Sequence, residues 1–323
     1  MRTELDGAIA AVVERIEREG IPEWHALSVD AARRIEDEVF GGADPPPVDL
    51  VRDLAVDGPG GDLPLRVYRP DAETPAPVVV FYHGGGWTLG TLDSSDDICR
   101  QFARRTGAVV VSVDYRLAPE HPFPAAVDDA YAALRWVAEH AGAVGGDPER
   151  LAVAGTSAGG NLAAATALRA RDEGGPDLAA QALCYPMVDD AALDGGVDGG
   201  DATGDDSGGS YAENADGPLL TRRDVAWFWD QYLRSSVDRA NPYAVPAETD
   251  DFGDLPPATV VTCGHDPLRD EGADYAEALD DAGVDVDHLH YPSVPHGVLS
   301  LAEDAAVADE AFGDVAASLR ARL

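Results

Sequence analysis

Ser157 lies at the centre of the run Gly155-Thr156-Ser157-Ala158-Gly159, between an apolar run at 151–154 and a helical pattern that begins near Gly159. A sharp turn from strand to helix at such a run holds a serine hydroxyl in strained backbone geometry. The start of the following helix favours negative charge that develops at that hydroxyl. The run therefore predicts that Ser157 is a nucleophile; the alternative is an ordinary glycine-rich turn.

A serine nucleophile needs a base, and the base needs an acid that orients it. The chain has eight His, and His296 follows the last apolar run, in a segment that can reach back over a sheet. His288 and His290 lie inside that run at a spacing of two, as ordinary strand residues do. Asp266 follows shortly after the apolar run at 259–262 and is the predicted acid. Asp270 is the rival, but it falls one turn into the next helix.

The run His83-Gly84-Gly85-Gly86-Trp87 follows another apolar run, at 78–82. A loop without side chains can turn backbone N–H groups toward the oxyanion that forms during acyl transfer, and each such donor lowers the barrier by about 3 kcal/mol. The predicted donors are the amides of Gly85, Gly86 and Ala158. The alternative is that the three glycines form a flexible hinge.

These segments need a scaffold, and the chain alternates apolar runs of strand length with helical patterns. Near-continuous Val, Ile and Leu runs of this kind predict a mostly parallel sheet covered on both faces, with its ligand site at the carboxyl ends of the strands. The predicted strands are Leu65–Tyr68, Val78–Tyr82, Val109–Val113, Leu151–Ala154, Ala182–Tyr185, Thr259–Thr262 and Val284–His290. The predicted helices are Leu5–Glu19, Ser28–Phe40, Ser95–Arg105, Ala125–His140, Gly159–Arg171, Thr221–Leu233, Leu268–Ala282 and Ala305–Leu323.

One stretch interrupts this alternation. The segment from Asp189 to Gly209 holds seven Asp and seven Gly, and this composition predicts a solvated loop rather than a packed element.

The charge balance is the outlying feature of the composition. Asp and Glu number 60 against 23 cations, all of them Arg, so the formal net charge is −37. A chain this acidic is a poor partner for nucleic acid or for an anionic membrane. Such a surface repels itself unless salt screens it. We therefore expect a halophilic source, a halophilic archaeon with a salt-rich cytosol; the alternative is an acidic mesophilic protein.

The three Cys, at 99, 184 and 263, are widely spaced and predict neither a disulfide framework nor a metal site. The first twenty residues lack the long apolar run of a signal peptide or membrane span, so we expect a cytoplasmic protein.

Several motifs carry a resemblance to a known family. They are His83–Trp87, the run Asp114-Tyr115-Arg116-Leu117-Ala118-Pro119-Glu120-His121-Pro122-Phe123-Pro124-Ala125, the run Gly155–Gly160 and Asp266-Pro267-Leu268-Arg269-Asp270-Glu271-Gly272. From about Pro64 to its end the chain resembles the hormone-sensitive-lipase family of microbial carboxylesterases. The resemblance implies an α/β-hydrolase fold, with a mostly parallel eight-stranded sheet, helices on both faces and a helical cap. Residues 1–47 and 188–240 would form the cap, and residues 48–187 and 241–323 the catalytic core.

The resemblance also implies an activity. A Ser157–His296–Asp266 esterase would hydrolyse short to medium acyl esters of small molecules without a cofactor or a metal, and homodimers occur in this family. His83 would hold the glycine loop in place, and Trp87, Tyr185 and Trp227 are candidate pocket residues. The aromatic residues at 227–229 either line an acyl pocket or dock the cap helix.

Two other functions stay open. The same three residues also serve amidases and peptidases, and some relatives of the family only bind ligands. The chain departs from the family pattern at Thr156, where Asp is usual, at Val298, where Phe is common, and in the length of the Asp189–Gly209 stretch.

Overall fold

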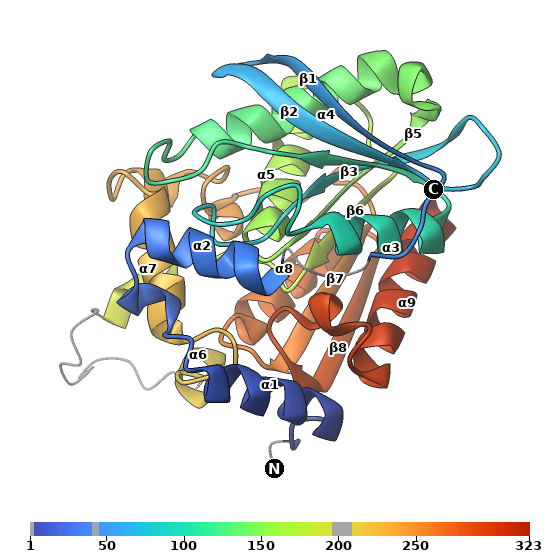
Figure 1. Ribbon diagram of the computed structural model, residues 1–323. Coiled ribbons are helices and arrows are strands. Elements are labelled where there is room, and N and C mark those ends of the chain that lie inside the picture. The colour runs from blue at the N-terminus through green and yellow to red at the C-terminus, as the bar shows by residue number, and fades with distance from the viewer. Residues whose placement is uncertain (1–2, 41–44, 196–208) are drawn as a thin grey trace.

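Runs of Val, Ala and Leu build the centre of the molecule. The computed structural model describes residues 3–40, 45–195 and 209–323. Within them, an eight-stranded sheet has the strand order β1-β2-β4-β3-β5-β6-β7-β8 (Figure 1). The strands β1 and β2 and the pair β2–β4 are antiparallel, and every other pair is parallel. The strands are β1 (Leu50–Gly58), β2 (Gly61–Arg69), β3 (Ala76–Tyr82), β4 (Val109–Val113), β5 (Gly146–Thr156), β6 (Ala180–Cys184), β7 (Ala258–His265) and β8 (Val286–Pro295).

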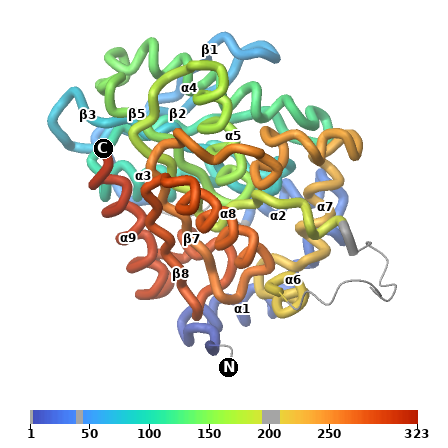
Figure 2. The backbone as a smooth tube through the Cα atoms, turned by 180° about the vertical axis from the view of Figure 1, so that it is seen from behind, coloured from blue at the N-terminus to red at the C-terminus, as the bar shows by residue number. Residues whose placement is uncertain are grey.

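Helices cover both faces of this sheet. Helices α4, α5 and α8 pack on one face, and α3 and α9 lie side by side on the other (Figures 1 and 2). None of the helices in the described parts of the chain is long and apolar enough to cross a membrane. The α-helices are α1 (Gly7–Glu19), α2 (Val29–Phe40), α3 (Asp96–Thr106), α4 (Ala125–Val144), α5 (Ala158–Glu173), α6 (Ser210–Glu213), α7 (Arg222–Tyr232), α8 (Arg269–Asp281) and α9 (Ala306–Arg322). Short 3-10 turns are η1 (Trp24–Ala26), η2 (Ala191–Gly195), η3 (Asp238–Ala240), η4 (Pro246–Glu248) and η5 (Val298–Leu301).

The two-residue repeat of a strand explains why the central runs are apolar throughout. On β3, Val78, Val80 and Tyr82 join the core beneath α4 and α5, whereas Val79 and Phe81 join the core beneath α3 and α9. Both faces of the strand are buried, so polar residues have no place in it. The predicted doubly covered, mostly parallel sheet is confirmed.

The predicted elements match the observed ones within a few residues, but the sequence pattern predicts neither β1 nor the four-residue helix α6. This strand was missed because it is an edge strand, paired on one side only, and its exposed Arg and Asp residues interrupt the apolar pattern. Strand β8 also extends to Pro295, beyond the predicted end of this strand at His290.

Helices α1, α2, α6 and α7, here called the cap helices, lie at the edge of the sheet where the parallel strands end (Figure 1). The N–H of Asp6, which caps α1, donates to the carbonyl of Ser293 on β8 at 2.8 Å. Both the backbone N–H and the ring Nδ1 of His25 contact Oδ1 of Asp224, at 2.9 and 3.0 Å. This pair joins η1 to the first turn of α7.

The stretch from Asp189 to Gly209 is described only at its two ends, and residues 196–208 of the predicted loop lie outside the described residues. Its first residues are packed, which corrects the prediction for this part. Asp190 is buried and forms an ion pair with Arg239, and Ala192 is buried in the core. An ion pair with a nearby Arg is what lets an acidic residue enter the interior here.

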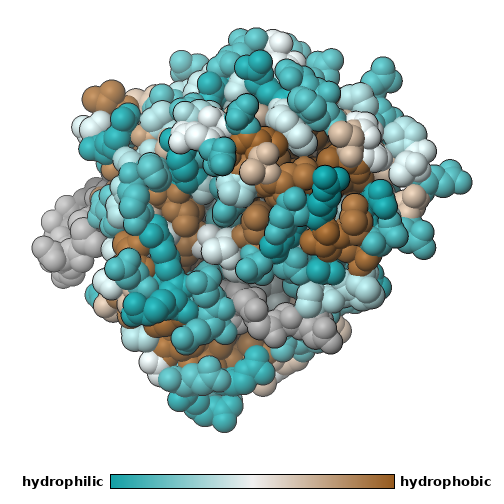
Figure 3. Space-filling model, turned by 45° about the horizontal axis from the view of Figure 1, so that its top comes forward, coloured by the Kyte–Doolittle hydropathy of each residue, from teal (hydrophilic) through white to brown (hydrophobic). Residues whose placement is uncertain are grey.

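Most of the acidic residues that the structure describes lie at least partly exposed on the outer surface. On the face shown in Figure 3, hydrophilic side chains predominate and apolar ones reach the surface in separate patches between them. Val237 is the large apolar residue that is most exposed among those described, at 79 %.

Candidate active site

Ser157 occupies the turn between β5 and α5, as the sequence predicts. Its φ of 56° and ψ of −120° lie in a region that residues other than glycine rarely adopt, and such strain costs about 1–3 kcal/mol. The neighbouring glycines make the turn possible. A methyl group added to Gly159 would lie 2.0 Å from the carbonyl oxygen of Tyr82, and one added to Gly155 would lie 2.0 Å from that of Gly159.

His296 and Asp266 meet Ser157 at the carboxyl edge of the sheet. Nε2 of His296 lies 3.0 Å from Oγ of Ser157, and Nδ1 lies 2.8 Å from Oδ2 of Asp266. Asp266 directly follows β7, and its side chain is only 1 % exposed; its Oδ1 accepts the N–H of Leu268 at 2.9 Å. The His296 side chain is 12 % exposed and stands edge-on to the ring of Tyr185, with 4.9 Å between ring centroids. The three residues thus form one continuous chain of polar contacts.

The rival residues lie elsewhere. Asp270, in the first turn of α8, pairs with Arg269 and accepts the N–H of Ser210. His288 and His290 share one face of β8, and both rings contact the Thr262 hydroxyl, at 2.8 and 2.9 Å. Neither histidine takes the place of His296.

The glycine loop lies against the serine turn. A methyl group on Gly84 would lie 3.5 Å from Cβ of Ser157. Gly85 and Gly86 adopt positive φ values of 101° and 57°, which glycine enters without strain, and Ala158 begins α5, where the first amides of a helix have no carbonyl of that helix to donate to. The role of these three amides as oxyanion donors near Ser157 stays a prediction.

His83 is buried beneath this loop rather than facing the serine hydroxyl. Its Nδ1 donates to the carbonyl of Gly84 at 2.8 Å, and its ring stacks on Tyr115 with 4.2 Å between centroids. The Tyr115 hydroxyl in turn donates to the His83 carbonyl at 2.8 Å. Burial lowers the pKa of His83 to about 4, so its ring is neutral near pH 7.

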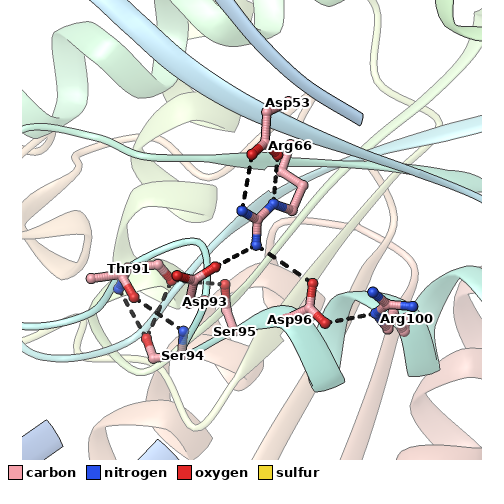
Figure 4. A network of polar contacts seen from close by, with 8 residues as sticks. All are labelled: Asp53, Arg66, Thr91, Asp93, Ser94, Ser95, Asp96 and Arg100. Atoms are coloured by element: carbon pink, nitrogen blue, oxygen red, sulfur yellow. Dashed lines mark hydrogen bonds and ion pairs between the residues drawn. The ribbon is translucent and has the colours of Figure 1, made fainter. Parts of the chain in front are cut away.

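A network of charged residues holds the segment that follows the glycine loop (Figure 4). Arg66 on β2 donates to both carboxylate oxygens of Asp53 on β1, at 2.6 and 3.1 Å, and to Asp93 at 2.6 Å. Asp96, at the start of α3, lies 3.6 Å from Arg66 and pairs with Arg100. One arginine thus joins the first two strands to the loop and to α3.

Aromatic side chains join the cap to the glycine loop. Trp87 is fully buried; it stacks on Tyr232 of α7 with 4.0 Å between ring centroids and meets Trp229 at 4.5 Å. The ring of Phe228 covers Gly86, since a methyl group there would lie 2.1 Å from ring carbons. Trp229 therefore docks the cap helix, one of the two roles left open for this run. Trp227 is half-buried and edge-on to Phe228.

The pocket roles of Trp87, Tyr185 and Trp227 stay predictions.

The sequence does not predict the contacts that support the segments around the site. Arg33 of α2 donates to the carbonyls of Thr88 and Ala118, at 2.9 and 3.0 Å, and pairs with Glu120. In the sequence, Arg33 is one Arg on an amphipathic helix, and no local pattern indicates which backbone carbonyls it contacts.

The fold and this arrangement define a class of protein, and comparison with known proteins gives the same class. A family model described as alpha/beta hydrolase fold matches residues 79–300, so the chain belongs to the α/β-hydrolase family, in its hormone-sensitive-lipase-like branch. Within that family it is a carboxylic ester hydrolase, because esterases that are 36–47% identical match it over most of its length.

Three relatives illustrate the likeness. Esterase LipI of Mycobacterium tuberculosis is 45% identical over 275 residues, which cover 84% of this chain and 81% of that protein. Carboxylesterase NlhH of the same species is 47% identical over 266 residues, 81% of this chain and 79% of that protein. Ethyl acetate hydrolase of Pseudomonas putida is 36% identical over 310 residues, covering 93% and 92%.

Among solved structures, a hyperthermophilic esterase from the archaeon Pyrobaculum calidifontis superposes with a TM-score of 0.88 at 38% identity and covers 99% of both chains. The predicted α/β-hydrolase fold is confirmed.

Proposed function

We propose that the chain is a serine carboxylesterase that hydrolyses small-molecule esters of short to medium acyl chains through Ser157, His296 and Asp266. The observation that carries the proposal is the unbroken chain of contacts from Ser157 Oγ through the His296 ring to Asp266. The ethyl acetate hydrolase relative, which covers nearly the whole chain, supports a small ester as the substrate class.

In the first half of the reaction, Nε2 of His296 takes the Ser157 proton while Oγ attacks the ester carbonyl carbon. The carbonyl oxygen becomes an oxyanion, which the amides of Gly85, Gly86 and Ala158 stabilise. Asp266 accepts the Nδ1–H of His296, so the ring keeps the tautomer whose Nε2 is a base, and the carboxylate stabilises the positive ring that forms. The imidazolium then protonates the departing alcohol, and an acyl-enzyme remains.

In the second half, His296 takes a proton from water, and the resulting hydroxide equivalent attacks the acyl carbon. The same amides hold the second oxyanion. Return of the proton to Oγ of Ser157 releases the carboxylic acid and restores the enzyme.

A panel of p-nitrophenyl esters from acetate to palmitate, assayed on the wild type and on Ser157→Ala at several salt concentrations, tests the proposal. We expect rates to be highest for short and medium chains and to vanish in the variant. Faster cleavage of a p-nitroanilide than of the matching ester would instead identify an amidase.

The surroundings in which the enzyme works are a second part of the proposal. The net charge of −37 and the absence of Lys support a protein from a halophile, working in a salt-rich cytoplasm. The proposed chemistry needs one carboxylate, Asp266, and most of the other acids that the structure describes lie at the surface, where they favour solubility and hydration. Assembly as a homodimer stays a prediction that the size of the protein in solution would test.

A further inference from the structure

Helix α6 and the residue after it contact the turn that carries Asp266. The side chains of Ser210 and Asn214 both belong to residues only 1 % exposed, and both reach backbone carbonyls of that turn. The segment 210–214 belongs to the cap side of the molecule, next to α1 in both views (Figures 1 and 2). We call Ser210, Tyr211 and Asn214 the α6 clamp.

Asn214 contacts the acid itself. Its Nδ2 donates to the carbonyl oxygen of Asp266 at 2.8 Å and to that of Gly264 at 3.3 Å. The backbone oxygen of Asp266 is thereby held on one side, while Oδ1 accepts the Leu268 amide and Oδ2 faces His296. All three oxygen atoms of Asp266 have a partner. The backbone oxygen has two, the N–H of Arg269 at 3.2 Å and the shorter contact from Asn214, which comes from the cap.

Ser210 holds the next residues of the turn. Its hydroxyl donates to the Pro267 carbonyl at 2.7 Å and accepts the Asp270 N–H at 3.1 Å, while its own N–H donates to Oδ2 of Asp270 at 2.6 Å. The turn is thus tied to α6 at both ends.

Tyr211 completes the clamp at the first turn of α8. Its hydroxyl donates to Oε2 of Glu271 at 2.5 Å, and Oε1 of the same carboxyl accepts the N–H of Val188 at 2.8 Å. The contact joins the cap, helix α8 and the segment after β6 at one buried carboxyl group.

We propose that Asn214 is a positioning residue for Asp266, and that the α6 clamp makes the contact between Asp266 and His296 depend on the docking of the cap segment. The contribution of this contact to the reaction rate depends on the orientation of the two groups, since a misplacement of about 1 Å can lower the rate roughly a hundredfold. A cap that only covered substrate would change binding. A cap that holds the acid changes the chemical step as well.

The test compares Asn214→Ala with His25→Ala, which removes a cap contact of similar size away from the Asp266 turn. For Asn214→Ala we expect kcat on p-nitrophenyl acetate to fall about 10- to 100-fold with KM within about twofold of the wild type. The low-field proton resonance of an imidazole Nδ1–H bound to a carboxylate should weaken or vanish. His25→Ala should retain both kcat and the resonance.

A wild-type kcat and resonance in Asn214→Ala would overturn the proposal, even if thermal stability fell as in His25→Ala. Should Asn214→Ala fail to fold, Ser210→Ala decides by the same measurements, because it removes a smaller α6 side chain that contacts the same turn. Because this inference rests on the proposed triad, Ser157→Ala and His296→Ala are run in parallel. Activity in those variants contradicts the proposed function, whereas their inactivity beside a fully active Asn214→Ala contradicts only the positioning role.

Discussion

Nε2 of His296 lies 3.0 Å from Oγ of Ser157, although the two residues are 139 positions apart in the chain. The ring reaches this place because His296 immediately follows β8 and stands edge-on to Tyr185, which follows β6. The distance suits direct proton transfer between the two atoms. We therefore expect replacement of either Ser157 or His296 to abolish the contribution of both residues to catalysis.

Replacement of either residue tests this dependence. We expect Ser157→Ala and His296→Ala each to lower kcat by about a million-fold, and the double variant to be no slower than either single one, because the two groups act as a unit. Ester hydrolysis rates and circular dichroism spectra check this together. Additive losses in the double variant would contradict it.

His83 should behave differently from His296. We expect His83→Ala to lower kcat about a hundredfold, the order of one lost oxyanion donor, because the glycine loop loses the ring that holds the Gly84 carbonyl. Since burial lowers the pKa of His83 to about 4, the ring is neutral through the working range. In the profile of kcat against pH above about pH 5, the midpoint of the acid limb should therefore be the same in His83→Ala as in the wild type. A displaced acid limb would show that His83 itself transfers protons.

The contact between the cap and the glycine loop has a steric test. A side chain at Gly86 would overlap the Phe228 ring, so we expect Gly86→Ala to lose about a hundredfold in kcat through displacement of its amide. Adding Phe228→Ala removes the closest ring atoms and should restore part of that loss. A double variant that is no faster than the product of the two single effects predicts would mean that the ring is not the obstacle.

Glu271 should make stability depend on pH. Burial raises the pKa of Glu271 well above its ordinary value, so above that ordinary value the folded state binds a proton that the unfolded state has lost. The contribution of the protonated Glu271 carboxyl to the free energy of unfolding is therefore fully present at low pH and is lost as the pH rises through the raised pKa. From about pH 5 to about pH 8 we expect the unfolding free energy to fall less steeply in Glu271→Gln than in the wild type.

Urea unfolding at constant salt measures these slopes. Glu277→Gln, an exposed change on the same helix, should follow the wild-type slope. Equal slopes for all three proteins would show that Glu271 titrates as an ordinary surface carboxyl.

Salt should stabilise the protein. Raising KCl from about 0.1 M to about 1 M shortens the Debye length from about 10 Å to about 3 Å, which screens repulsion among the excess acids. The same screening weakens exposed pairs such as Arg66–Asp93, but such pairs contribute little, about 0–1 kcal/mol each. We expect the melting temperature to rise with KCl well beyond its response to sucrose, a solute that is excluded from the surface without screening charge. Full stability at millimolar salt would exclude the proposed halophilic adaptation.

The sequence by itself was enough to predict the parallel sheet and to single out Ser157, Asp266 and His296. Each of the three follows an apolar run, and parallel strands that leave a sheet at the same edge bring such residues together. The glycines near Ser157 and at 84–86 can also be read from the sequence, because a strained turn and a loop without side chains both require glycine at particular positions.

Tertiary structure alone decided the contacts between distant segments. No local sequence pattern indicates these contacts. Examples are the packing of Phe228 on Gly86 and the hydrogen bonds from Arg33 to the Thr88 carbonyl and from Asn214 to the Asp266 carbonyl. They arise where the cap packs on the sheet edge. A side chain that satisfies a backbone carbonyl fifty residues away looks, in the sequence, like any other Asn.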